Sequence, residues 1–285
     1  MKRLRLVLVL IALALLALIV IVIAIPENGS EVGQMEEEAE QGDADVQFKL
    51  ARSYQKGDGV RQDFEKAAKW YREAAKQGHA EAQFELGLCC YSGKGVKRDV
   101  DEAEKWYRKA AEQGYVRAQR KLGDFYYFDF ASRQDRTEAV KWYRMAAQNG
   151  DAESQCKLGR CYYDGAGIEK DLAEAVKWLR KSAENGNADG QFNLGVCYYF
   201  GDGVKQDFAE AAKWYNKAAV QGHAKAQYNL GICYSKGEGV KKDQAQTVEW
   251  YRKAAEQGVD RAQYELGVCY CNGIGVEQND EEAIK

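Results

Sequence analysis

The sequence predicts an all-α protein, a solenoid of helix-turn-helix repeats that follows one membrane-spanning helix. The six tryptophans of the 285-residue chain recur every 36 residues, and a glutamine, a leucine and a glycine series keep the same interval. Self-similarity at a fixed period of this length indicates a repeat architecture. Residues 6–25 are all Leu, Val, Ile or Ala, the composition of a transmembrane helix.

The apolar segment 6–25 is long enough to cross a bilayer, because 20 helical residues rise about 30 Å. Three basic residues among the first five precede this segment. Basic residues favour the cytoplasmic side, so we expect a single-pass protein with a cytoplasmic N-terminus and an extracytoplasmic repeat domain. The alternative is a secreted protein whose signal peptide is cleaved near Val22 and Ala24, although the apolar segment exceeds the usual length in such peptides.

The chain is expected to divide into three segments: a signal anchor at 1–25, an acidic spacer with a short capping helix at 26–42, and a repeat solenoid at 43–285 with six full units and a truncated seventh. Residues 27–45 carry eight acidic side chains and no basic one. They are predicted to form a solvated spacer or an acidic interaction tail. The six residues after Asn279 are too few for a self-sustaining helix, so we expect them to fray.

Each repeat is expected to form two helices. In the unit that begins at Ala80, apolar residues follow helical spacing up to Tyr91, and the glycines of a Gly-Lys-Gly-Val sequence end the helix. Asp99 then caps the second helix, and Glu102 completes a capping box. The same pair of capping residues is expected in later units, at Asp135/Glu138, Asp171/Glu174, Asp207/Glu210, Asp243/Gln246 and Asn279/Glu282.

A glycine recurs in the middle of the first helix of each unit, at Gly87, Gly123, Gly159, Gly195, Gly231 and Gly267. Glycine inside a helix costs about 1 kcal/mol relative to alanine, so its recurrence indicates a close approach of two helices. The expected partners are alanines of the second helix, such as Ala103. A single helix pair cannot bury both faces of its helices, and stacking of successive units supplies the core.

Written as one pattern, the unit is A-x-x-Q-x-x-L-G-x-x-Y-x-x-G-x-G-V-x-x-D-x-x-x-A-x-x-W-Y-x-x-A-A-x-x-G, which residues 188–222 match almost completely. This pattern resembles the Sel1-like repeat, a relative of the tetratricopeptide repeat, over residues 43–285. The resemblance implies a right-handed α-solenoid that acts as a scaffold or adaptor and binds other proteins. The third unit departs from the pattern, because Asp129-Phe130-Ala131 replaces Gly-x-Gly. Either this loop forms another turn, or it presents Phe128 and Phe130 to a partner.

The resemblance also places a protein-binding groove on the concave face, which the first helices line in related solenoids. The expected groove residues are Phe84, Tyr91, Arg120, Asp124, Tyr127, Arg160, Tyr163, Phe192, Tyr199 and Tyr228. Aromatic and arginine side chains are common anchors of protein interfaces. Arg120 and Arg160 are expected to form a basic patch for an acidic or C-terminal carboxylate. Alternatively, the aromatic residue that follows each glutamine packs between adjacent units.

Composition argues against several other classes of function. The net charge of −3 provides no basic excess for nucleic-acid binding. The chain has two histidines, His79 and His223, and no C-x-x-C sequence, so we predict no metal site and no cofactor. Both histidines are expected at helix starts, as turn residues or weak caps.

The cysteines are expected to be free and buried rather than paired. Five of them share one position in the first helix, at Cys89, Cys161, Cys197, Cys233 and Cys269, and the second helices contain none. Two S-x-x-K sequences, at 53–56 and 154–157, lack the K-T-G and S-D-N partners of penicillin-binding enzymes. We therefore predict a membrane-tethered scaffold and no enzyme. The alternative is an envelope protein with a small-ligand site or a weak β-lactamase-like activity, as described for some members of the family.

Overall fold

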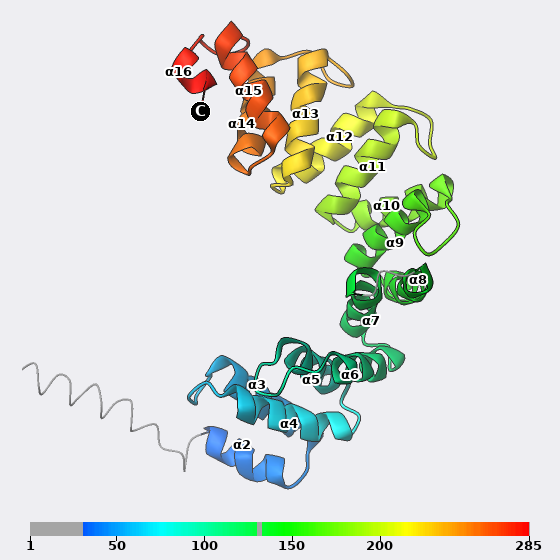
Figure 1. The fold of residues 1–285 in the computed structure, drawn as a ribbon, viewed down its shortest axis with the longest axis vertical. Helices are drawn as coiled ribbons and strands as arrows, with labels where there is room; N and C mark the ends of the chain where they lie inside the picture. The colour runs from blue at the N-terminus through cyan, green and yellow to red at the C-terminus, as the bar shows by residue number, and fades with distance from the viewer. Residues whose placement is uncertain (1–30, 130–132, 285) are drawn as a thin grey trace, which may run out of the picture. The chain divides into compact units, whose positions relative to one another are not determined.

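The computed structural model describes residues 31–129 and 133–284 (Figure 1). All regular structure within these ranges is helical, which confirms the all-α prediction. The chain forms two compact units, Met1–Ala118 and Gln119–Lys285. The predicted membrane-spanning helix at 6–25 and the predicted loop residue Phe130 lie outside the described residues. Among the helices that are described, none is both long enough and apolar enough to cross a membrane.

The first unit consists of consecutive helices that pair along the chain. Their bounds are α2 Glu31–Glu40, α3 Ala44–Lys56, α4 Phe64–Lys76, α5 Ala80–Ser92 and α6 Val100–Glu112, followed by the start of α7 Val116–Asp124. Helix α2 lies where the capping helix is predicted. Buried Val32 and Ala39 attach it to the unit, and the Gln47 side chain donates to the Ala39 carbonyl at 2.9 Å. Helix α2 therefore takes the place of a second helix before the first repeat.

The second unit continues the same arrangement, and Figure 1 shows α11 beside α12 and α13 beside α14. The bounds are η1 Phe125–Asp129, α8 Arg133–Gln148, α9 Ala152–Asp164, α10 Leu172–Glu184, α11 Ala188–Phe200, α12 Phe208–Val220, α13 Ala224–Lys236, α14 Gln244–Glu256, α15 Asp260–Asn272 and α16 Asp280–Ala283. Asn279 caps the short α16 by accepting from the backbone N–H groups of Glu281 and Glu282.

Glycines end the first helices and aspartates start most of the second ones. Gly93, with a φ of 74°, ends α5 in the left-handed region. Gly95 follows with a φ of 73°, and a Cβ there would overlap the Phe64 carbonyl. The Asp99 carboxylate accepts from the Glu102 N–H at 2.8 Å, as the capping box requires. The expected caps are also confirmed at Asp171, Asp207, Asp243 and Asn279.

The cap expected at Asp135 is wrong. Helix α8 begins at Arg133, so Asp135 lies inside its first turn rather than before it. The preceding first helix is also irregular, because α7 has nine residues and passes into a π-helical segment, Phe125–Asp129. The missing Gly-x-Gly sequence removes the left-handed stop that ends the other first helices. The first helix instead continues into the π-helical segment, where Phe128 is 68% exposed.

Four of the six mid-helix glycines approach a tyrosine ring rather than an alanine side chain, which corrects the expected contact; Gly159 approaches Leu179, and Gly267 approaches the Ala283 carbonyl. A Cβ at Gly87 would lie 2.6 Å from the ring of Tyr107 and 3.3 Å from the carbonyl oxygen of Ala103. Tyr107 follows the repeated tryptophan and is fully buried. The alanine therefore contributes its backbone carbonyl, and the tyrosine ring fills the space that the glycine leaves.

The repeated glutamine is a buried link between successive repeats. The Gln83 side chain donates to the Ala75 carbonyl at 3.1 Å and accepts from the Gln113 side chain at 2.7 Å. The same two bonds recur around Gln155, Gln191 and Gln227. Each glutamine thus binds the second helix before it and the second helix after it, and its buried polar atoms are satisfied.

The five cysteines that share a repeat position are buried, as expected, and the eight cysteines of the chain are free thiols. Burial raises the pKa of Cys89 to about 11 and the pKa of Cys161 to about 12. These side chains therefore act as small apolar residues. Cys271 differs, because it is exposed.

Candidate functional site

The face formed by the first helices carries a contact that recurs in several repeats. The residue after the glutamine packs on the residue that precedes the next first helix. Phe48 stacks on His79 with ring centroids 4.6 Å apart, and Phe192 stacks on His223 at the same distance. Phe84 packs on Tyr115 at 5.5 Å. Three of these joints are therefore aromatic pairs.

The two histidines cap helices, as expected, and each also faces a carboxylate. The Nδ1 atom of His223 accepts from the Ala226 N–H at 3.1 Å, and its Nε2 atom lies 3.1 Å from Asp189. His79 repeats this arrangement with the Ala82 N–H at 3.1 Å and with Asp45 at 3.3 Å. The hydrogen bond with His223 lowers the pKa of Asp189.

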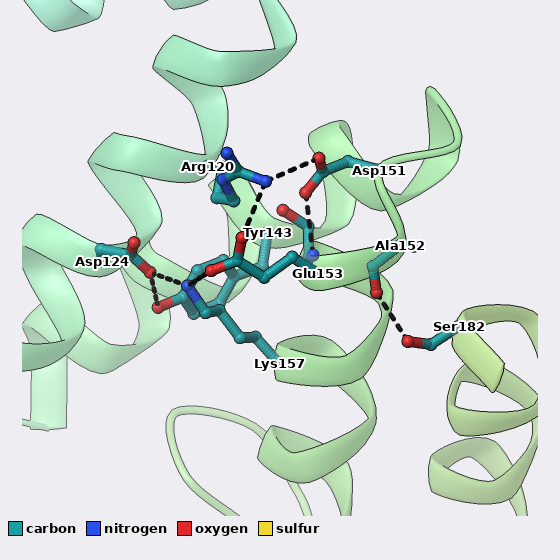
Figure 2. A network of polar contacts seen from close by, with 9 residues as sticks. Arg120, Asp124, Tyr143, Asp151, Ala152, Glu153, Lys157 and Ser182 are labelled. Carbon is teal, nitrogen blue, oxygen red and sulfur yellow. Dashed lines mark hydrogen bonds and ion pairs between the residues drawn. The ribbon is translucent and has the colours of Figure 1, made fainter. Parts of the chain in front are cut away.

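Arg120 occupies the aromatic position of this joint in the third repeat (Figure 2). Its Nη1 atom lies 3.0 Å from Asp151 and 2.8 Å from Glu153. Asp151 stands at the position that His79, Tyr115 and His223 occupy in the aromatic pairs, and it also caps α9 by accepting from the Ser154 N–H at 2.9 Å. An ion pair has replaced the aromatic stack. Arg120 is therefore neutralised within the chain and does not form the expected open patch with Arg160.

A second group of charges lies beside Arg120, as Figure 2 shows. The Lys157 ammonium lies 2.7 Å from both Asp124 and Glu153. The Tyr143 hydroxyl donates to Asp124 at 2.9 Å. Burial lowers the pKa of Lys157, but the hydrogen bonds to the two carboxylates outweigh it, and the net pKa is raised. Lys157 is therefore a protonated structural cation.

This arrangement leaves the S-x-x-K sequence at 154–157 without a general base. Lys157 is held by two carboxylates, and the Ser154 hydroxyl is fully buried with no hydrogen-bond partner among the described residues. A nucleophilic serine needs an accessible hydroxyl and a base within hydrogen-bond reach. Across residues 31–129 and 133–284, no group of three or more His, Cys, Asp or Glu side chains could hold a metal ion.

The other residues expected to line the groove differ in how accessible they are to a binding partner. Phe84 is buried between Tyr107 and Tyr115, so it packs inside the solenoid rather than facing a partner. Phe192, Tyr228, Tyr91, Tyr163 and Tyr199 are half-buried. Two of them make bonds to the next repeat: the Tyr163 hydroxyl donates to Asp202 at 2.6 Å, and the Tyr199 hydroxyl donates to Glu238 at 2.6 Å. Arg160 is exposed and forms no ion pair with the described residues.

The first unit contains an open pocket of about 450 Å³ on this same face. Its lining residues are Asp45, Phe48, Lys49, His79, Ala80, Glu81 and Tyr115. Apart from Phe48 and Tyr115, these side chains are polar or small, and Asp45, Lys49 and Glu81 are exposed. Sequence reasoning missed this pocket. The sequence did contain a signal for it: His79 and His223 share one repeat position, and both occur in repeats that have a phenylalanine after the repeated glutamine.

The family model of the Sel1 repeat matches the chain seven times, at residues 44–79, 80–115, 116–151, 152–187, 188–223, 224–259 and 260–285. The chain therefore belongs to the Sel1 repeat family, and it is an all-helical solenoid of these repeats. Proteins of this family generally mediate protein–protein interactions and are generally scaffolds without enzymatic activity. No curated protein matches the chain significantly.

Several solved structures are similar to the chain, and two of them are at least 34% identical to it. One is c5321, a protective antigen present in uropathogenic Escherichia coli strains that displays an SLR fold, with 35% identity and a TM-score of 0.84. The match covers 90% of this chain and 55% of that one, so the chain spans about half the length of this relative. The other is a Sel1 repeat protein from Oxalobacter formigenes, with 34% identity, a TM-score of 0.77, and coverage of 89% and 74%.

Proposed function

We propose that this chain is a membrane-tethered scaffold that binds a protein or peptide along the face formed by its first helices. The pocket of about 450 Å³ between α3, α5 and the start of α7 carries this proposal. It combines the rings of Phe48 and Tyr115 with exposed charged groups, and interface anchors insert into hollows of this kind. The partner is a protein or peptide rather than nucleic acid, because the net charge is −3.

The tether is supported by the composition of residues 6–25, which are uniformly apolar and follow three basic residues. Membrane attachment would hold the repeats near a surface and raise the local concentration of a partner on the same surface. The repeat domain would then lie outside the cytoplasm. Secretion after signal cleavage would keep the same compartment and remove the tether.

Site-specific crosslinking tests the binding face. A photoreactive phenylalanine analogue replaces exposed Lys49 or Glu81 at the pocket in the full chain, and replaces exposed Lys69 on α4 as the matched control. We expect a discrete crosslinked partner from Lys49 and Glu81 and none from Lys69. Crosslinks from Lys69 alone, or from none of the three positions, would contradict the proposal.

The exposed thiol of Cys271 tests the compartment. A maleimide that cannot cross membranes should label Cys271 in intact cells if the repeats are extracytoplasmic, and Cys271→Ser should abolish the signal. Labelling only after the membrane is opened would place the repeats in the cytoplasm. Extraction with alkaline carbonate tests the tether separately, because a protein held by residues 6–25 stays in the membrane fraction. Release into the supernatant would indicate cleavage or peripheral attachment.

A further inference from the structure

Two tyrosines of the second unit bind a carboxylate supplied by the next repeat. Tyr163 donates to Asp202 and Tyr199 donates to Glu238, each at 2.6 Å. Each acid is the middle residue of a Gly-x-Gly loop. The backbone N–H groups of Asp202 and Glu238 donate to Cys197 and Cys233 at 2.9 and 3.0 Å, which fixes both loops in the same way. A tyrosine hydroxyl paired with a carboxylate is therefore a recurring contact of this solenoid.

Tyr127 occupies the equivalent position one repeat earlier, but its acid is missing. The corresponding loop residue is Ala166, and its N–H donates to Cys161 at 3.0 Å, so the backbone follows the same course. The Tyr127 side chain is half-buried, and its hydroxyl makes no hydrogen bond with the described residues. A methyl group thus stands where the later repeats place a carboxylate, and a donor is left without its acceptor.

Two arginines act on this tyrosine, and one of them lies over its ring. The Arg136 guanidinium lies 5.9 Å from the centre of the Tyr127 ring, and Arg160 is exposed. Burial raises the pKa of Tyr127, and the charges of Arg160 and Arg136 oppose that shift, so both cations act on the hydroxyl. The negative charge of Asp164 instead raises the pKa of Tyr127. Neither arginine forms an ion pair with the residues that the structure describes.

Both arginines stand at positions that are mostly apolar in the other repeats. The residues equivalent to Arg136 are Phe64, Val100, Leu172 and Phe208, with Gln244 and Asp280 as the polar exceptions. Those equivalent to Arg160 are Leu88, Val196, Ile232 and Val268, with Arg52 and Asp124 as the charged exceptions. One arginine therefore stands in each of the two repeats that meet at Tyr127 and Ala166. Arginine binds carboxylates through paired, charge-assisted hydrogen bonds, and a tyrosine hydroxyl supplies a further donor.

The geometry points to a carboxylate-binding site formed by Tyr127, Arg136 and Arg160, in which a carboxylate of the bound partner takes the place that Asp202 and Glu238 fill in later repeats. The site rests on the proposed function, since it supplies part of the binding face. The carboxylate can come from an acidic side chain or from a chain end. Arg120 takes no part, because Asp151 and Glu153 already neutralise it.

The first test uses the chain as its own ligand. Ala166→Asp places a carboxylate at the position of Asp202 in the next repeat, and we expect this variant to melt at a higher temperature than Ala166→Asn. Tyr127→Phe should reduce the difference, because the hydroxyl donor is lost. Equal melting temperatures for the Asp and Asn variants, in a chain that still contains Tyr127, would overturn the site.

The second test uses three fluorescent pentapeptides and the full chain in nanodiscs. The probes are amidated Ala-Ala-Glu-Ala-Ala, its Gln counterpart, and pentaalanine with a free C-terminus. We expect the Glu peptide to bind about tenfold more tightly than the Gln peptide, as a charge-assisted bond implies. Tighter binding of pentaalanine than of the Glu peptide would support the site and assign it to chain ends.

Matched variants identify the residues involved. Arg136→Met and Arg160→Met should each remove the preference for the Glu peptide, as should Ala166→Asp, whereas the exposed loop variant Arg61→Met should not. Equal binding of the Glu and Gln peptides, or no binding up to their solubility limit, would overturn the site. Crosslinks from Lys49 that persist in that case would leave the proposed function standing, whereas their absence would contradict both.

Discussion

Ser182 occupies the space that a side chain at Gly190 would need. A Cβ at Gly190 would lie 2.7 Å from the Ser182 Cβ and 3.0 Å from the Ala183 backbone nitrogen. The Ser182 hydroxyl donates to the Ala152 carbonyl at 2.6 Å, which holds the serine in that space (Figure 2). In the next repeat the equivalent residues are Ala218 and Ala226. Relative to that alanine pair, Ser182 has an additional hydroxyl oxygen and Gly190 lacks the methyl group.

Gly190→Ala is expected to destabilise the second unit by about 1–3 kcal/mol, because an added methyl group in a filled contact forces a shift. Ser182→Ala in the same chain should recover much of the loss, since it restores the alanine pair of the next repeat. Thermal unfolding of the two single variants and the double variant measures their coupling. Additive effects would show that the two residues do not share this space.

Arg120→Ala should lower the melting temperature, whereas Arg160→Ala should leave it nearly unchanged. Removal of Arg120 leaves Asp151 without its cation, whereas Glu153 keeps Lys157, and the loss of the Asp151 pair costs about 1–3 kcal/mol. Arg160 is exposed and has no partner among the described residues. The matched pair of variants distinguishes a structural arginine from a binding arginine. Equal melting temperatures would show that the ion pair in Figure 2 adds little stability.

One thiol should react rapidly in the folded chain. Cys271 is exposed, and the other seven cysteines are buried. Burial raises the pKa of Cys156 and Cys197 to about 12, so little thiolate forms near neutral pH. Titration with a chromogenic disulfide at pH 8 should count one fast thiol in the folded protein and eight in denaturant. Cys271→Ser should remove the fast phase. Several fast thiols would indicate that the repeats open readily.

The Tyr163–Asp202 bond should make stability depend on alkaline pH. The hydrogen bond to Asp202 and then burial raise the pKa of Tyr163 from 10.0 to about 12. Because the folded pKa is the higher one, this contribution is complete below pH 10 and is lost as pH rises towards 12. Melting temperatures from pH 8 to 12 should therefore fall less steeply for Tyr163→Phe than for the parent chain. Parallel curves would contradict this assignment.

Much of the repeat architecture was predictable because it depends on local signals. The cap at Asp99, the stop at Gly93 and the buried Gln83 recur at one interval, and recurrence separates them from chance. Asp135 was misassigned because the loop before it lacks the glycines that end the other first helices. The contact of Gly87 with Tyr107 was missed because spacing alone does not show which side chain of the partner helix fills the space beside a glycine.

The candidate site was less predictable, because its groups are paired through space. Arg120 and Asp151 lie at opposite ends of one repeat, and only the comparison of equivalent positions shows that they replace an aromatic pair together. The same comparison reveals that Ala166 replaces an acid. A pattern that keeps only shared residues discards both observations. The differences between repeats, rather than their consensus, carry the information about function.

The glutamine links of this solenoid have an evolutionary consequence. Each link joins positions that every repeat supplies in the same way, as Gln191 does with Ala183 and Gln221. Removal of residues 188–223 would bring Ala183 to Gln227 in the place of Ala219. Whole units can therefore be gained or lost by unequal recombination without an unsatisfied amide at the new junction. A deletion that is not a whole number of repeats would misalign the glutamine with its two partners. The length of this chain is therefore expected to evolve in steps of one repeat.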